Sequence, residues 1–269
     1  MQPFNPLNLP DTLQACAQGT ISVPVCTLQA PALWYVYPPA LTPIWSDGSG
    51  PTYIGYWQHW FVDREPCFVK LYVDCQCMTY EIARTPAQLL AVIAMMAMSV
   101  DDGITPQLEQ FADAVGLDCL AELDALSLKS GDDPRGFAEL ELFRTLTPLD
   151  SVPGNGAPYT GDFPDPANAS RAWWNSSCSF EVVHRDMHVP PGVELPAWFD
   201  PQQDKKALFE GFLAAERLDC AWLTLNSTGW SIADARRAIV QLQVKAGDEA
   251  FNRVVAAWLA IASTDAGGY

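Results

Sequence analysis

Two histidines in the second half of the chain have a spacing that can bind a metal ion. His184 and His188 are four residues apart with Asp186 between them, and on a helix this spacing places both imidazoles on one face. The flanking Glu181-Val-Val and Val189-Pro-Pro segments favour an extended chain instead. There, two side chains four residues apart are separated by about 13 Å. We therefore interpret both as ordinary polar histidines and predict no metal site.

Three cysteines in the first third of the chain could be interpreted as a zinc or redox cluster. They are Cys67, Cys75 and Cys77, but none of the eight cysteines forms a Cys-x-x-Cys pair. On a strand Cys75 and Cys77 point to the same face, as small apolar side chains against a core do. Cys119 and Cys220 lie in apolar helical patterns. We predict reduced, mostly buried cysteines.

Patterns typical of nucleophilic or phosphoryl-transfer catalysis are missing. The sequence has no Gly-x-Ser-x-Gly elbow, no phosphate-binding glycine loop and no dinucleotide fingerprint. His184-Arg-Asp186 matches only part of a kinase catalytic loop. The adjacent carboxylates Asp101-Asp102 and Asp132-Asp133 fit turns and helix N-caps. The sequence therefore predicts no enzyme and no cofactor, with a hydrolase built on His184 or His188 as the alternative.

The charge balance is strongly acidic, with 32 Asp and Glu against 15 Lys and Arg and a formal net charge of −17. Nucleic acids and anionic membranes both require clustered basic side chains, so neither is expected as a partner. Because 49% of the residues are hydrophobic and only 17% are charged, the chain has enough apolar material for a globular core. A positively charged partner is the first to consider.

Targeting signals are not recognised. The N-terminal residues have neither a basic region nor an apolar run that resembles a secretory leader. The longest apolar run, Leu89 to Met98, is shorter than the roughly 20 residues that a membrane span requires. We expect a cytoplasmic protein.

Short strands and turns are predicted between Pro31 and Glu81. The runs follow one another too closely for crossover helices, so an antiparallel sheet is expected. Ser46 to Pro51 is dense in turn-forming residues. Lys70 between apolar neighbours indicates a sheet with one face at least partly wet. The runs start at Trp34, Pro43, Thr52, Cys67 and Met78.

Helices are predicted after the sheet and throughout the last third. Thr85-Pro-Ala-Gln88 supplies an N-cap, a first-turn proline and a capping-box glutamine for a buried helix to about Met98. Thr105-Pro106 and Gly116 bound a second helix. Further helical segments are 119–127, 135–145, 204–217, 231–246 and 249–263.

The predicted fold class is α+β, with an antiparallel sheet and packed helices in the N-terminal half and a mainly helical C-terminal half. Residues 149–170 are rich in proline and glycine and are interpreted as a linker. We predict one domain over residues 1–148, with its sheet core at 31–98, and a helical domain over 171–269.

Ten tryptophans are an unusually large number for 269 residues. Most are expected in the core, and Trp57 and Trp60 are candidates for anchors at a protein interface. Exposed aromatic rings beside carboxylates also form sugar platforms, so a carbohydrate-binding domain is the alternative function.

Residues 43–95 resemble the SUKH superfamily. The resemblance rests on Pro43 to Gly55 with its Ser46-Asp-Gly-Ser-Gly50 turn, on Phe68 to Val73, and on Tyr80 to Leu90. Many members of that superfamily are bacterial immunity proteins, which neutralise a toxin of a contact-dependent or type VI secretion system. The resemblance implies a non-catalytic protein whose partner is a toxin.

Charge and resemblance together predict an immunity protein that binds a basic, nuclease-type toxin. Nuclease toxins are commonly basic because they hold phosphates, and an acidic partner would be captured faster. The sequence leaves the oligomeric state open, with a homodimer as one alternative. The predicted toxin-contacting residues are Asp101, Asp102, Asp132, Asp133, Asp162, Asp165, Trp57 and Trp60.

Overall fold

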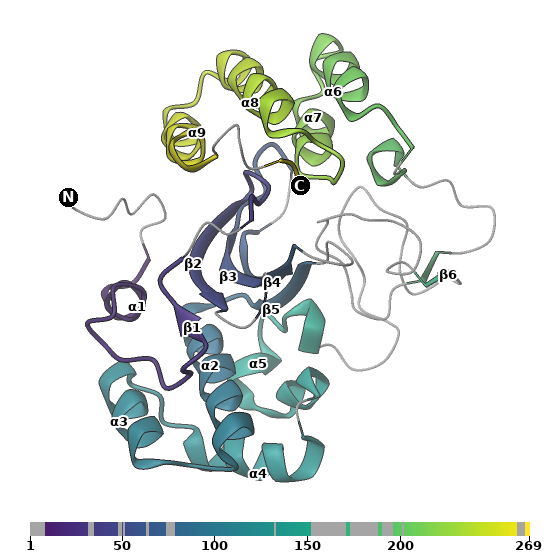
Figure 1. The fold of residues 1–269 in the computed structure, drawn as a ribbon. Coiled ribbons are helices and arrows are strands. Elements are labelled where there is room, and N and C mark those ends of the chain that lie inside the picture. Colours follow the sequence, from purple (N-terminus) through teal and green to yellow (C-terminus); the bar gives the residue numbers. More distant parts are fainter. Residues whose placement is uncertain are drawn as a thin grey trace.

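Five strands form one sheet at the centre of the molecule (Figure 1). The computed structural model describes residues 9–31, 35–47, 50, 52–62, 65–73, 79–131, 133–151, 171–172, 188–189, 196–200, 202–262 and 267–269. The strands are β1 (Leu28–Gln29), β2 (Leu41–Asp47), β3 (Thr52–Trp57), β4 (Cys67–Tyr72) and β5 (Thr79–Ala83). Each pairs antiparallel with the next in chain order, as predicted.

Helices follow the sheet and make up most of the described C-terminal half, so the predicted α+β class is confirmed. The helices are α1 (Asp11–Ala17), α2 (Pro86–Asp101), α3 (Pro106–Val115), α4 (Leu120–Ser130), α5 (Glu141–Arg144), α6 (Lys205–Ala214), α7 (Leu218–Leu225), α8 (Ile232–Ala246) and α9 (Glu249–Ile261). Short 3₁₀ helices are η1 (Pro134–Glu139), η2 (Leu149–Ser151) and η5 (Ala197–Phe199), and β6 (Arg171–Ala172) pairs with β7 (His188–Val189). Within the described ranges, no helix combines the length and apolar character needed to cross a bilayer.

Capping residues set the starts of the helices that the sequence predicts best. Thr85 and Gln88 form a complete capping box at α2. Thr105 caps α3, whose end at Gly116 has φ +71°. Ser231 and Asp248 cap α8 and α9 in the same way. By contrast, α1 and α7 begin without a side-chain cap, and α1 was not predicted from the sequence.

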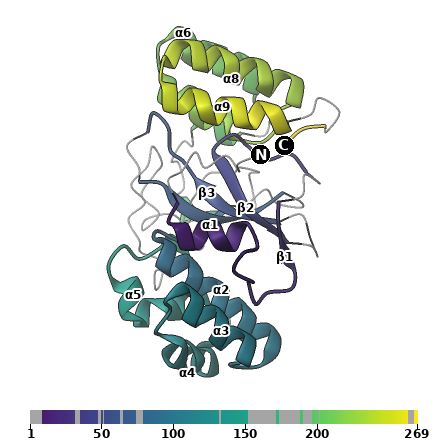
Figure 2. The same cartoon turned by 90° about the vertical axis from the view of Figure 1, so that its left-hand side faces the viewer.

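Both faces of the sheet are covered by helices (Figure 2). Along β3 and β4 successive side chains enter two different cores. Tyr53 and Val69 pack with the core of α6 to α9, while Ile54 and Phe68 pack with that of α2 to α5. The prediction of one face that is at least partly wet therefore applies only around Lys70, Tyr72 and Tyr80, which are partly exposed, because helices cover the rest of both faces. Lys70, which suggested it, is half-buried with its ammonium 5.2 Å from the centroid of the Tyr72 ring.

Strands β2 and β3 approach each other unusually closely at Gly55. A Cβ atom there would lie 2.5 Å from the carbonyl oxygen of Thr42, so no other residue fits without moving backbone. The pairing is irregular between Pro43 and Trp45. A bulge of this kind lets Ile44 and Trp45 enter the same core although they are neighbours in sequence.

Two element predictions need correction. Trp34 lies outside the described residues, and Tyr35 to Tyr37 form no strand, because Pro38 and Pro39 follow directly and have no N–H group for a ladder. The helix predicted at 135–145 is divided at Leu140 into η1 and α5, since Leu140 has the extended angles φ −78° and ψ 138°.

The start of the predicted linker is ordered, because Leu149, Asp150 and Ser151 are buried in η2. Residues 152–170 lie outside the described residues. The division into domains of residues 1–148 and 171–269 stays a prediction. The core on one face of the sheet contains strand residues such as Val69 together with Trp222 and Phe251 of the C-terminal helices.

Candidate functional site

The predicted acidic contact residues lie in different environments. Asp101 and Asp102 are exposed at the end of α2. Asp133 is partly buried; its carboxylate accepts the backbone N–H of Arg135 and forms a 2.6 Å ion pair with the Arg135 side chain. Asp133 therefore serves as an N-cap of η1. Asp132, Asp162 and Asp165 lie outside the described residues.

The two predicted tryptophan anchors lie against the core of the C-terminal helices. Trp57 is 3% exposed. Trp60 is partly buried, with its ring 5.3 Å from that of Phe251 in an edge-to-face contact. Its indole N–H is buried and has no hydrogen-bond partner among the residues that the structure describes. The structure thus places both rings in packing roles.

One helical layer carries several exposed carboxylates with no basic side chain among them. Residues 86–128, which comprise α2, α3 and α4 as far as Leu128, contain no lysine or arginine; we call this segment the acidic layer. The next residue of α4, Lys129, forms an ion pair with Glu139 outside the segment. Six of its carboxylates are exposed and that of Asp124 is partly buried. The seven acidic residues are Asp101, Asp102, Glu109, Asp113, Asp118, Glu122 and Asp124.

Large apolar side chains are also exposed on the acidic layer. Val100 at the end of α2, Ile104 before α3 and Leu128 near the end of α4 are 65%, 38% and 84% exposed. Helices α2 and α4 pack against each other. Single exposed apolar side chains are common on protein surfaces, and here they supply area that a bound protein could bury.

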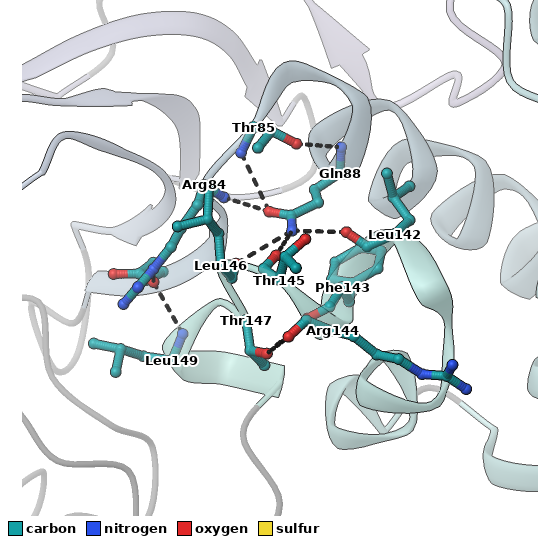
Figure 3. Close-up of polar contacts among 11 residues, drawn as sticks. Arg84, Thr85, Gln88, Leu142, Phe143, Arg144, Thr145, Leu146, Thr147 and Leu149 are labelled. Atoms are coloured by element: carbon teal, nitrogen blue, oxygen red, sulfur yellow. Dashed lines mark hydrogen bonds and ion pairs between the residues drawn. The ribbon is translucent and has the colours of Figure 1, made fainter.

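A buried glutamine fixes the start of α2 to the segment that follows α5 (Figure 3). The side-chain oxygen of Gln88 accepts the backbone N–H groups of Arg84 and Thr85. Its amide nitrogen donates to the carbonyl oxygens of Leu142, Thr145 and Leu146, at 3.0, 3.4 and 3.2 Å. One fully buried amide therefore bonds to five backbone groups, with its two hydrogens shared among the three carbonyl oxygens.

Glu81 on β5 extends this connection to η2. Its carboxylate accepts the guanidinium N–H of Arg84 at 2.6 Å and the backbone N–H of Leu149 at 3.0 Å. Holding Leu149 also places the next residue, Asp150, whose buried side chain lines a cavity. The network thus positions a carboxylate that the sequence patterns do not single out.

The cavity has a volume of about 550 Å³ and lies between the sheet and the C-terminal half of α2. One wall is apolar and includes Met95 and Met96 of α2. The opposite wall is formed by the sheet, where Lys70 and Tyr80 are register partners on β4 and β5. The exposed Ser99 and Val100 border the cavity, so it opens beside the acidic layer.

The other candidate residues do not gather into a site where the structure describes them. No set of three His, Cys, Asp or Glu side chains in the described ranges is placed to hold a metal ion. His184, Cys75 and Cys77 lie outside those ranges, and His188 is in β7. The described cysteines are free thiols, as predicted: Cys16, Cys26, Cys67, Cys119 and Cys220. Burial raises the pKa of the Cys16 thiol to about 11, so it is poorly reactive.

Comparisons with family models, with curated proteins and with solved structures find no match to this chain. The resemblance of residues 43–95 to the SUKH superfamily therefore stays a prediction. The function has to be inferred from the chain's own surface and cavity.

Proposed function

We propose that the protein is an immunity protein that binds a basic, nuclease-type antibacterial toxin in the cytoplasm, covers its active site and has no catalytic activity of its own. The single observation that carries this proposal is the acidic layer. Its seven carboxylates are not balanced by any lysine or arginine in the same segment.

The acidic layer fits a basic protein partner in two ways. Its one-signed charge would attract the surface with which a nuclease holds phosphates, and such steering raises association rates by about 10 to 10³. The exposed Val100, Ile104 and Leu128 supply apolar area that a protein partner can bury. A free metal ion or small cation would not need these apolar side chains.

The test compares two double charge reversals that change the net charge equally. Asp101→Lys with Asp113→Lys alters the acidic layer, whereas Glu210→Lys with Glu249→Lys alters α6 and α9 at the other helical layer. All four side chains are exposed, so both variants are expected to fold. The partner is captured from the native host at low salt, identified, and used for binding kinetics and growth protection.

The acidic-layer variant is expected to associate at least about tenfold more slowly, and its rate should depend less on salt. Growth protection against the partner expressed in the same cells should weaken in parallel. Equal association rates for the two double variants would contradict the role of the acidic layer. A captured partner that is not toxic would contradict the immunity function itself.

A further inference from the structure

The lining of the cavity beside α2 combines aliphatic side chains with two carboxylates. Ile82, Val92, Met95 and Met96 supply aliphatic carbon and two thioethers, which adapt to ligands of different shape. Asp47 brings a carboxylate from the end of β2, and Asp150 of η2 brings another from the side of β5, so β3 and β4 lie between them. At about 550 Å³ it is within the range of about 300 to 1,000 Å³ typical of small-molecule sites. The lining therefore suits a molecule with an apolar tail and one charged head.

The sign of the head follows from the charges around the cavity. Two carboxylates and one ammonium, that of Lys70, line it. The ammonium already lies over the ring of Tyr72, and the opening borders the acidic layer, which has no basic residue. A carboxylate has several lone pairs, so Asp47 and Asp150 can accept a further hydrogen bond beside those they already make. An anionic head would be repelled there and a cationic head attracted.

Aromatic rings strengthen the preference for a cation. The Tyr72 and Tyr80 rings meet edge to face at 5.8 Å on the sheet wall, and Phe137 lies on the side of η1. Ring faces attract organic ammonium groups. We propose that this cavity binds a small amphipathic amine, with its alkyl or aryl tail along α2 and its ammonium group near Asp150, on the side of β5. Amine binding here does not depend on the proposed function, because it concerns a small molecule and not a toxin.

The test uses three probes with the same eight-carbon tail: octylammonium, octanoate and 1-octanol. Binding is followed at neutral pH by calorimetry and by the NMR signals of ¹³C-labelled methionine methyl groups. We expect octylammonium to shift the Met95 and Met96 signals saturably. We expect octanol to bind more weakly and octanoate most weakly. Tightest binding of octanoate, equal binding of all three probes, or no saturable shift at Met95 and Met96 would each overturn it.

Variants locate the site and its charge. Val100→Trp places a bulky ring at the opening and is expected to abolish binding of octylammonium. Val244→Trp on α8 is the matched control, since Val244 is also well exposed but does not line the cavity. Asp150→Asn should weaken octylammonium binding by about tenfold, while Lys70→Met should tighten it by removing a like charge. Unchanged affinity in Val100→Trp, or the opposite sign for Lys70→Met, would contradict the assignment.

Discussion

The helices on the two faces of the sheet carry very different charges. The acidic layer has seven acidic and no basic side chains, whereas residues 205–262, which we call the C-terminal layer, have six acidic and seven basic ones. In the C-terminal layer opposite charges are often paired, as in Lys206 with Glu210 and Arg217 with Asp219. The acidity of the whole chain is therefore not an even coat that only maintains solubility. Within the acidic layer it is not balanced by any basic side chain, and Val100, Ile104 and Leu128 are exposed there as well.

The two layers also satisfy backbone carbonyls at their buried junctions differently. The acidic layer uses the neutral amide of Gln88, which donates to three carbonyl oxygens. The C-terminal layer uses the ammonium group of Lys205, which donates to the carbonyl oxygens of Trp198 and Asp200 at 2.6 and 2.8 Å. Lys205 is 4% exposed, and burial lowers its pKa to about 8. A neutral amide donates its hydrogen bonds at any pH, whereas a buried ammonium group makes the free energy of unfolding depend on pH.

The largest effect is expected for Gln88→Met. The side chain keeps its volume but loses the bonds to two N–H groups and three carbonyl oxygens, of which those of the exposed Thr145 and Leu146 can turn to water, so the free energy of unfolding should fall by about 2 to 4 kcal/mol. Urea unfolding followed by tryptophan fluorescence measures it. Gln241→Met on the exposed face of α8 is the control and should change little. A loss below about 1 kcal/mol for Gln88→Met would show that the network is dispensable.

The hydrogen bonds of Gln88 at the start of its own helix could be predicted from the sequence. The capping box follows from Thr85 and Gln88 three residues apart, and the same kind of signal predicts α3, α8 and α9. The bonds to Leu142, Thr145 and Leu146 could not, because they join segments more than fifty residues apart. Likewise, the sequence around Lys70 predicts a solvent-exposed sheet face, because nothing in its own strand shows that helices cover both faces of the sheet.

Lys205 should give the C-terminal layer a distinctive pH dependence. Its pKa is lower in the folded than in the unfolded chain, so between about pH 8 and 10.5 the unfolded chain holds more protons. The free energy of unfolding should therefore gain up to about 3 kcal/mol from this group as the pH rises through that window. Lys205→Met removes the gain.

The comparison with Lys205→Met is needed because other groups titrate in the opposite sense. Burial raises the pKa values of Cys16 and Tyr269, so those two groups lower the stability at high pH. Unfolding is measured in urea from pH 7 to pH 9.5 for both proteins. Wild type should gain stability relative to the variant above pH 8. Two curves that run parallel would mean that Lys205 keeps an ordinary pKa in the folded protein.

Gly55 tests the sheet that both layers share. A methyl group at this position would lie 2.5 Å from the Thr42 carbonyl oxygen and 2.9 Å from the Pro43 Cα. Gly55→Ala should therefore destabilise the protein by about 1 to 3 kcal/mol. Gly211→Ala in α6 is the control, since a methyl group there would meet nothing within 4 Å, and it should stabilise by about 0.5 to 1 kcal/mol. The same sign for both substitutions in thermal unfolding would contradict the close approach.

Only some features of the candidate sites could be predicted from the sequence. The lack of lysine and arginine over residues 86–128 can be counted directly, and Asp101 and Asp102 were named among the contacts. The cavity was not visible, because Lys70, Met95 and Asp150 come from separate segments and meet only through the packing of α2 on the sheet. For Trp57 the residue type suggests a protein interface. Successive side chains of β3 point to opposite faces of the sheet, however, and that of Trp57 lies in the core shared with the C-terminal helices.

The smallest effects should show the difference between the layers most directly. In α3, Glu109 and Asp113 are like charges four residues apart, so Asp113→Lys creates an attractive pair and should stabilise by about 0.2 to 0.5 kcal/mol. In α6, Lys206 and Glu210 already attract each other at 3.9 Å, so Glu210→Lys should destabilise by a similar amount. Both differences should shrink in high salt. If Asp113→Lys stabilises the fold while slowing capture of the partner, the unbalanced charge of the acidic layer is retained for binding at the expense of stability.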